Sequence, residues 1–209
     1  DAGQFQTGGD AYNDEMDVTE DVIAAIDAQG GITGGGLVYG DTSAALEFVT
    51  EEYYRSVWSR WNTPEQLDSM VHFKDRNEEG LLADRVQLYG MEQFPLDHLT
   101  VLEGDLSKLS EPGGRYVAAV YSGRPELGSH WARLGDTVTI RYVEEYEYYN
   151  PDTGEVYGPW ENVPDGANWV DRAVKYRDVE YEVAALVTVP MALSYRYYGA
   201  DEFILNDQT

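Results

Sequence analysis

The sequence predicts an α+β fold, in which a mixed or antiparallel sheet is covered on one face by helices near the N-terminus. The segments with helical periodicity lie early in the chain, and most segments that alternate apolar and polar residues follow them. The composition, with 43% hydrophobic residues, 17 Tyr and 5 Trp, is typical of a folded globule rather than a disordered acidic tail. Glycine- and proline-rich turns separate the strand-like segments.

A chain of 209 residues is long enough to bury a substantial core, and we expect one domain over residues 1–209. Within it, an α+β part should comprise about 1–133 plus 190–209. A β-rich lobe should comprise about 134–189, where strand-like segments and a strong hairpin turn follow one another.

Three helices are predicted before residue 75, because each segment combines a capping residue with an apolar face of helical spacing. They run from Asp17 to Gly30, from Glu51 to Trp61 after the N-cap Thr50, and from Pro64 to Met70 after Thr63. The apolar face of the second helix contains Tyr54, Val57, Trp58 and Trp61. Aromatic residues at this spacing indicate core packing rather than a cofactor site.

The strands are predicted from alternation and from the turns that bound them. Expected strands are Leu37–Tyr39, Leu46–Val49, Val86–Tyr89 (ended by Gly90), Val101-Leu102, Tyr116–Tyr121, Thr137–Tyr149, Glu155–Tyr157, Tyr176–Val189 and Phe203–Leu205. A turn or short helix is expected at Pro95–Asp97, a polar connection at Ser107–Gly114, a loop at Ser122–Arg133, and a helix or loop at Met191–Gly199. Gly135-Asp136 and Asn150–Gly154 are expected to form turns.

The net charge of −25 excludes several classes of partner. It repels phosphate backbones, so nucleic-acid binding is disfavoured, as is docking on anionic lipid through a basic patch. The acidic surface could attract a cationic peptide or Ca²⁺, or it could serve solubility or adaptation to salt. With no Cys in the sequence, disulfides, thiolate catalysis and cysteine-based zinc sites are excluded.

No constellation of catalytic or metal-binding residues stands out, so we predict no catalytic, cofactor or metal site. The three histidines, His72, His98 and His130, lack the spacing of a metal site. The glycines Gly34–Gly36 lack the pattern of a phosphate-binding loop. The acidic stretch Asp10–Asp17 lacks the order of ligands found in calcium loops.

The strongest sequence signal is a set of four phrases in a fixed order. They are VQLYGMEQFPLDHLTVLEGDL at Val86–Leu106, LGDTVTI at Leu134–Ile140, the strand Val179–Val189 containing YEVAALV, and the apolar Phe203–Leu205. Together they resemble the extracytoplasmic, MacB-like periplasmic core domain of MacB-like and FtsX-like ABC transporter permeases. The resemblance covers a little over half the chain. Its markers are Tyr89, Gly90, Leu102, Gly104, Gly135 and Asp136, read as structural residues and not as ligands.

This resemblance implies a soluble domain that is not itself an enzyme, on the extracytoplasmic side of the cell membrane, between the first two transmembrane helices of a permease. The chain itself has no run of the ~20 apolar residues that a membrane helix needs. The implied partners are an ATP-binding subunit, a peptide, lipid-linked or antibiotic substrate, and a second permease in a dimer. Two departures from the pattern are Ala184-Ala185 in place of the usual glycine and a longer segment at Arg141–Arg177.

Two readings from other classes remain open. A secreted carbohydrate-binding module or glycoside hydrolase is suggested by the tyrosines and tryptophans between Tyr146 and Trp169, near Glu144, Glu145 and Glu147. Carbohydrate binding would require exposed ring faces in one row, and a retaining hydrolase would require two carboxyl groups about 5 Å apart. The other reading is a purely structural surface protein.

Overall fold

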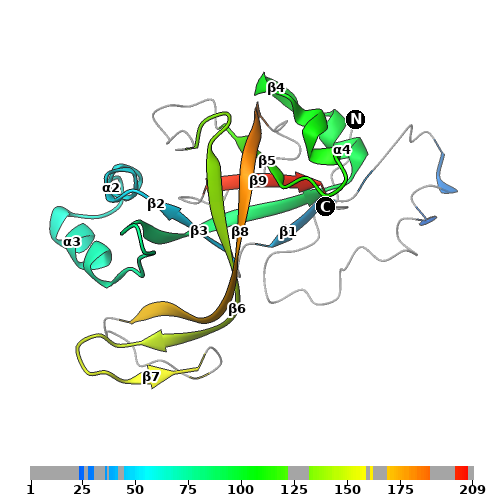
Figure 1. Ribbon diagram of the computed structural model, residues 1–209. Coiled ribbons are helices and arrows are strands. Elements are labelled where there is room, and N and C mark those ends of the chain that lie inside the picture. Colours follow the sequence, from blue (N-terminus) through cyan, green and yellow to red (C-terminus); the bar gives the residue numbers. More distant parts are fainter. Residues whose placement is uncertain are drawn as a thin grey trace.

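The computed structural model describes residues 38–41, 45–121, 132–158, 169–188 and 201–206, together with positions 24–25, 28–30, 36 and 161. The predicted α+β fold is confirmed: helices pack on one mixed sheet of nine strands within this part of the chain (Figure 1). The strands are β1 (Val38–Asp41), β2 (Ala45–Val49), β3 (Leu82–Met91), β4 (Thr100–Gly104), β5 (Tyr116–Val120), β6 (Thr137–Tyr149), β7 (Val156–Tyr157), β8 (Val170–Thr188) and β9 (Asp201–Asn206). The helices are α2 (Glu51–Trp58), α3 (Pro64–Phe73), α4 (Gln93–Asp97) and the 3-10 helix η1 (Leu106–Ser110).

Six strands close into a ring through successive backbone pairing. The order is β2–β3–β9–β5–β8–β6, and β6 pairs again with β2. The β3–β9 and β5–β8 pairs are parallel, and the other four are antiparallel. Closure pairs both edges of each strand over part of its length, so the six strands form one barrel-like body. β1 adds to β3 and β4 adds to β8 at its margins.

The main core fills this ring, since all six strands contribute to one buried cluster. Its fully buried members include Val86, Val117, Val138, Ile140, Val183 and Phe203. Val138 and Ile140 therefore lie on one face of β6, the face that points into the ring. The residues at alternate positions of the same strands, such as Ala118, Ala184 and Ile204, point away from the ring interior. They pack with α4 and η1 in a second cluster.

Helices α2 and α3 pack beside the β2–β3 end of the sheet, where Tyr54 and Val71 join Val49 and Leu82 in a third cluster (Figure 1). Both predicted caps are confirmed. The Thr50 hydroxyl accepts a hydrogen bond from Tyr53 N, and Thr63 forms a capping box with Gln66. The prediction for the end of α2 was wrong: the helix stops at Trp58, and Trp61 is 52% exposed.

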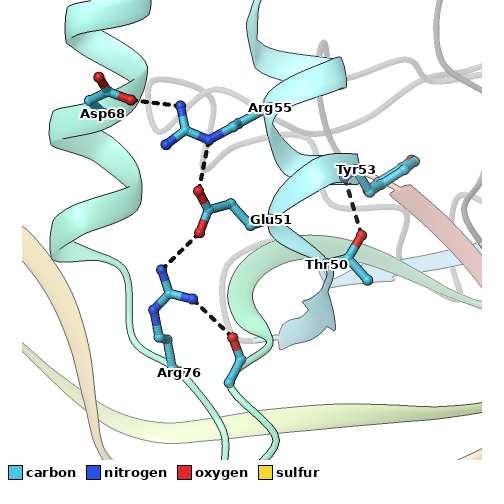
Figure 2. A network of polar contacts seen from close by, with 7 residues as sticks. Thr50, Glu51, Tyr53, Arg55, Asp68 and Arg76 are labelled. Carbon is cyan, nitrogen blue, oxygen red and sulfur yellow. Dashed lines mark hydrogen bonds and ion pairs between the residues drawn. The ribbon is translucent and has the colours of Figure 1, made fainter.

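An exposed network of ion pairs joins the two helices to the following loop (Figure 2). Glu51 bonds to Arg55 at 2.9 Å and to Arg76 at 3.3 Å, and Arg55 continues to Asp68 at 2.8 Å. The Arg76 guanidinium also donates to the carbonyl of Gly80. The two guanidinium groups lower the pKa of Glu51 through hydrogen bonding. Because these groups are exposed, the network orients α2 and α3 more than it stabilises them.

The strands β6 and β8 form one long antiparallel ribbon, paired from Thr137 with Glu182 to Tyr149 with Val170. Its register shifts between Val143 and Tyr146, and a bulge of this kind bends a ribbon. Beyond the bulge the ribbon carries β7 and projects away from the ring (Figure 1). We call residues 143–157 and 169–176 the arm. The predicted long strand at Thr137–Tyr149 and the hairpin turn that follows it are confirmed.

Several sequence predictions need correction. Gly90 was predicted to end a strand, but β3 continues through it to Met91, because β1 and β9 pair with Gly90 from both sides. β8 begins at Val170 instead of position 176, since β6 pairs with it along the arm. α3 extends to Phe73. The predicted segments 122–131 and 191–199, and most of the predicted helix 17–30, lie outside the described residues.

The Tyr54 hydroxyl is buried, with no hydrogen-bond partner among the described residues. Burial, assisted by the negative charge of Asp84, raises its pKa. We expect Tyr54→Phe to leave the free energy of unfolding unchanged or to raise it by about 1 kcal/mol, because an unpaired buried hydroxyl costs desolvation. The matched control is Tyr142→Phe, whose hydroxyl bonds to that of Tyr181 at 2.7 Å. Urea denaturation should show that the control lowers the free energy of unfolding by about 1 kcal/mol. A similar loss in Tyr54→Phe would contradict the conclusion that the Tyr54 hydroxyl makes no hydrogen bond with the described residues.

Candidate functional site

Three of the six marker residues, Gly104, Gly135 and Asp136, lie close together, where β4, β8 and the segment before β6 meet. Gly104 has φ +89°, and a Cβ there would lie closer than 3.0 Å to the carbonyl oxygen of Ala184, to Cδ1 of Leu134 and to Cα of Ala185. Only glycine accommodates both this backbone conformation and this approach. We call Gly104, Leu134, Gly135, Ala184 and Ala185 the motif junction.

Backbone hydrogen bonds fix the motif junction. Asp105 N donates to Ala184 O at 2.9 Å, and Gly135 N donates to Val183 O at 2.9 Å. Val183 N donates in return to Asp136 O, while the Asp136 carboxylate accepts from Arg133 N at 2.8 Å. The markers at this end of the molecule therefore have a structural role, holding three chain segments together.

The other markers lie apart from the junction. Tyr89 and Gly90 sit in the middle of the sheet, paired with β1 on one side and β9 on the other. Leu102 lies on β4 and is 53% exposed. The junction thus combines residues of the first three phrases, of which Ala184 and Ala185 are the departure from the pattern, whereas the fourth phrase, in β9, pairs with the strand that opens the first.

A pocket of about 380 Å³ lies where the arm meets the end of α3, and we call it the crook pocket. It is lined by His72, Phe73 and Asp75 from the body, and by Tyr149, Pro151, Asp152, Val170 and Arg172 from the arm. Phe73, Tyr149 and Val170 supply aromatic and apolar walls. The two sides come from segments about half the chain apart in sequence.

Asp75 is the half-buried acidic group of the crook pocket. Burial raises the pKa of its carboxyl, while a hydrogen bond from Ala173 N and the charges of Arg172, Arg141 and Lys74 oppose that rise. The backbone of Asp75 also accepts a hydrogen bond from Ala83 N at 2.9 Å. Asp75 therefore links the α3–β3 connection to both the sheet and the arm.

The cations around the crook pocket are engaged with other carboxylates. Arg172 Nε donates to Glu147 at 2.9 Å, and its guanidinium lies 4.6 Å from the centre of the Tyr149 ring. Arg141 makes two bonds of 2.8 Å to Asp178, and Lys74 lies 2.9 Å from Asp84. Each of these three cations thus bonds to another carboxylate in addition to its electrostatic interaction with Asp75.

Aromatic rings gather on the opposite face of the arm. Tyr146 and Tyr148 contact edge to face at 5.7 Å, and Tyr157 and Trp169 do so at 4.9 Å. Tyr148 pairs with Tyr157 across the strands, which joins the two contacts into one row. All four side chains are half-buried.

The histidines and glutamates that the sequence offered as candidate metal or catalytic residues lie in different environments. His72 lines the crook pocket, whereas His98 donates from Nδ1 to Phe94 O at 2.8 Å. Glu144 and Glu145 bond to Lys175, and Glu147 bonds to Arg172. His130 and the acidic stretch 10–17 lie outside the described residues. Among the residues that are described, no three His, Asp or Glu side chains are grouped to hold a metal ion.

Sequence reasoning missed the crook pocket. Asp75 and Arg172 lie in polar segments that carry no motif, and their proximity depends on the bend of the β6–β8 ribbon. The one local signal was the unusually long segment between Arg141 and Arg177, which forms most of the arm.

Comparison with protein-family models finds no match to this chain, and comparison with curated proteins finds none either. No helix within the described residues has the length and apolar character needed to cross a membrane.

Proposed function

We propose that this chain is the extracytoplasmic domain of an ABC transporter permease of the MacB/FtsX-like kind, a non-catalytic moving part. The observation that carries the proposal is where the described sheet begins and ends. Val38 of β1 and Asn206 of β9 both pair with Met91 of β3, on its two sides. Neighbouring strands lie about 4.8 Å apart, so these positions are about 10 Å apart.

This spacing suits a domain inserted between two membrane helices. Packed helices lie about 8–10 Å apart, which is close to the spacing of Val38 and Asn206. The ring of strands supplies a rigid body that can rock without chemistry of its own. Residues of three of the resembling phrases meet at the motif junction. This supports the proposal further, because residues that define a fold are expected to lie where its chain segments contact one another.

On this proposal the domain lies outside the cell membrane, and ATP hydrolysis by an ATP-binding subunit on the other side moves it. The cargo would be a peptide, a lipid-linked molecule or an antibiotic, and the full-length permease would act as a dimer. These assignments rest on the sequence resemblance.

The test is the intact mass and membrane fractionation of the native gene product. We expect a protein much larger than 23.5 kDa that stays with the membranes until detergent is added, and that co-purifies with an ATPase. A product close to 23.5 kDa found in the soluble fraction would overturn the proposal.

The aromatic row on the arm favours a second candidate, a secreted carbohydrate-binding module. These Tyr and Trp side chains, in edge-to-face contact, offer apolar faces with polar edges. The three glutamates once considered for glycoside hydrolysis are engaged in ion pairs with Lys175 and Arg172, which favours binding over catalysis. Titrating soluble oligosaccharides while following tryptophan fluorescence tests this candidate. A saturable change lost in Trp169→Ala would support it, and the absence of any change would exclude it.

A further inference from the structure

The crook pocket has the carboxylate of Asp75 in its lining. Arg172, a cation among the described lining residues, bonds to Glu147 and lies over Tyr149. Asp75 therefore adds a negative charge beside a cation that already bonds to another carboxylate, in a protein whose net charge is −25. Low-dielectric walls of a cleft focus such a field and raise the local concentration of cations.

The size and the lining of the pocket favour an organic cation over a metal ion. About 380 Å³ is within the range of small-molecule sites, and too large for a bare metal ion. Phe73, Tyr149 and Val170 can pack against an apolar stem, and an aromatic face attracts a positive charge. Asp75 uses one lone pair for Ala173 N and keeps acceptor capacity for a further donor.

We propose that the crook pocket binds an organic cation, an ammonium or guanidinium group on an apolar stem, with the Asp75 carboxylate as its main acceptor. An anion would meet no uncompensated positive charge there, because Arg172 is matched by Glu147. The cation would be either a free amine or the Lys or Arg side chain of a peptide. Because it would contact both α3 and the arm, its binding would hold the arm in place. The inference does not depend on the transport role.

The test uses the 209-residue chain and butylguanidinium, with the neutral isostere butylurea as the comparison ligand. NMR titration should show saturable shifts of the backbone amides of Phe73, Asp75 and Arg172 with butylguanidinium. The affinity for butylurea should be lower by at least about tenfold, because a charge-assisted hydrogen bond to a carboxylate is lost. Equal binding of the two ligands, or shifts elsewhere only, would overturn the proposal.

The decisive variant is Asp75→Asn, and the matched control is Glu180→Gln, an exposed carboxylate on β8 outside the pocket. Both remove one negative charge. Asp75→Asn should weaken butylguanidinium binding about tenfold, and Glu180→Gln should change it less than about twofold, because a distant exposed charge is screened. Equal weakening in both variants would show a diffuse acidic surface instead of a site.

Asp75→Asn is expected to fold, which keeps the test interpretable. Burial raises the pKa of Asp75 above its ordinary value of 3.8, so the folded state holds this proton more tightly than the unfolded state. Stability at this residue is therefore lost as the pH rises from 3.8 through the folded pKa. The amide avoids that loss and can still accept from Ala173 N. Urea denaturation should find the variant no less stable than the wild type at pH 7, with the difference shrinking toward pH 4.

Two further binding measurements identify the source of the cation. N-acetyl-arginine methylamide should bind as well as butylguanidinium if the pocket takes a peptide side chain. It should bind much more weakly if the pocket takes only free amines, since the backbone groups would not fit. In either case raising the salt concentration should weaken binding, and affinity that stays flat from low to high salt would contradict the electrostatic argument.

Discussion

Gly104→Ala is expected to destabilise the protein by about 2–5 kcal/mol. The residue has φ +89°, and an L-residue in the left-handed region costs about 1–2 kcal/mol. The added Cβ would also lie closer than 3.0 Å to the carbonyl of Ala184 and to Cα of Ala185. These are backbone atoms that cannot rotate away, so β4 must separate from β8, at a cost of about 1–3 kcal/mol. Thermal unfolding should show a midpoint lower by about 10 °C.

Gly113→Ala is the matched control, because Gly113 has φ +74° and no atom of the described residues lies within 4 Å of its added Cβ. It should cost only the conformational strain, about 1–2 kcal/mol. The difference between the two variants isolates the contact at the motif junction. If both lost the same stability, the close approach of Gly104 to β8 would not be a constraint of the fold.

The sequence predicted the elements whose determinants are local. β6 was predicted at its observed bounds because its alternation is long, and because turns at Gly135 and Asn150 bound it on both sides. The helix starts at Thr50 and Thr63 were predicted because a cap bonds within its own first turn. These signals do not depend on which segment packs against them.

The elements that long-range pairing decides could not be predicted in the same way. Gly90 has the local character of a strand breaker, yet β1 and β9 hold it in β3. The first residues of β8 are strand because β6 lies beside them. Closure of the six-stranded ring depends on pairs such as β3 with β9, more than 100 residues apart, and no alternation pattern specifies such a partner.

The motif junction and the crook pocket differ in the same respect, namely how far local sequence determines them. Gly104 and Gly135 of the motif junction were named from the sequence as structural markers, but that they meet at one place with Ala184 and Ala185 was not predicted. The crook pocket was not visible, because Asp75 and Arg172 acquire their roles only when the ribbon bends at Val143–Tyr146. Asp75 resembles the other acidic residues of the chain until its burial is known.

Lys74→Met is expected to cost about 2–4 kcal/mol, the second large effect. Asp84 is 8% exposed and lies directly opposite Glu47, which is 1% exposed, in the β2–β3 pair. Lys74 Nζ bonds to Asp84 at 2.9 Å, and Trp58 Nε1 donates to the other carboxylate oxygen at 3.1 Å. Removing the lysine leaves a buried charge facing a second acid, which costs more than the ion pair contributes. Urea denaturation at pH 7 measures the loss.

The double variant Lys74→Met/Asp84→Asn separates a lost attraction from an uncompensated charge. Asparagine keeps an acceptor for Trp58 Nε1 while removing the negative charge. If the cost of Lys74→Met arises from the charge left on Asp84, the double variant should recover most of the stability, with a coupling of about 1–3 kcal/mol. A double variant as unstable as Lys74→Met would show instead that packing of the lysine stem against Tyr54, whose ring centre lies 5.1 Å from Nζ, is what holds α3 against the sheet.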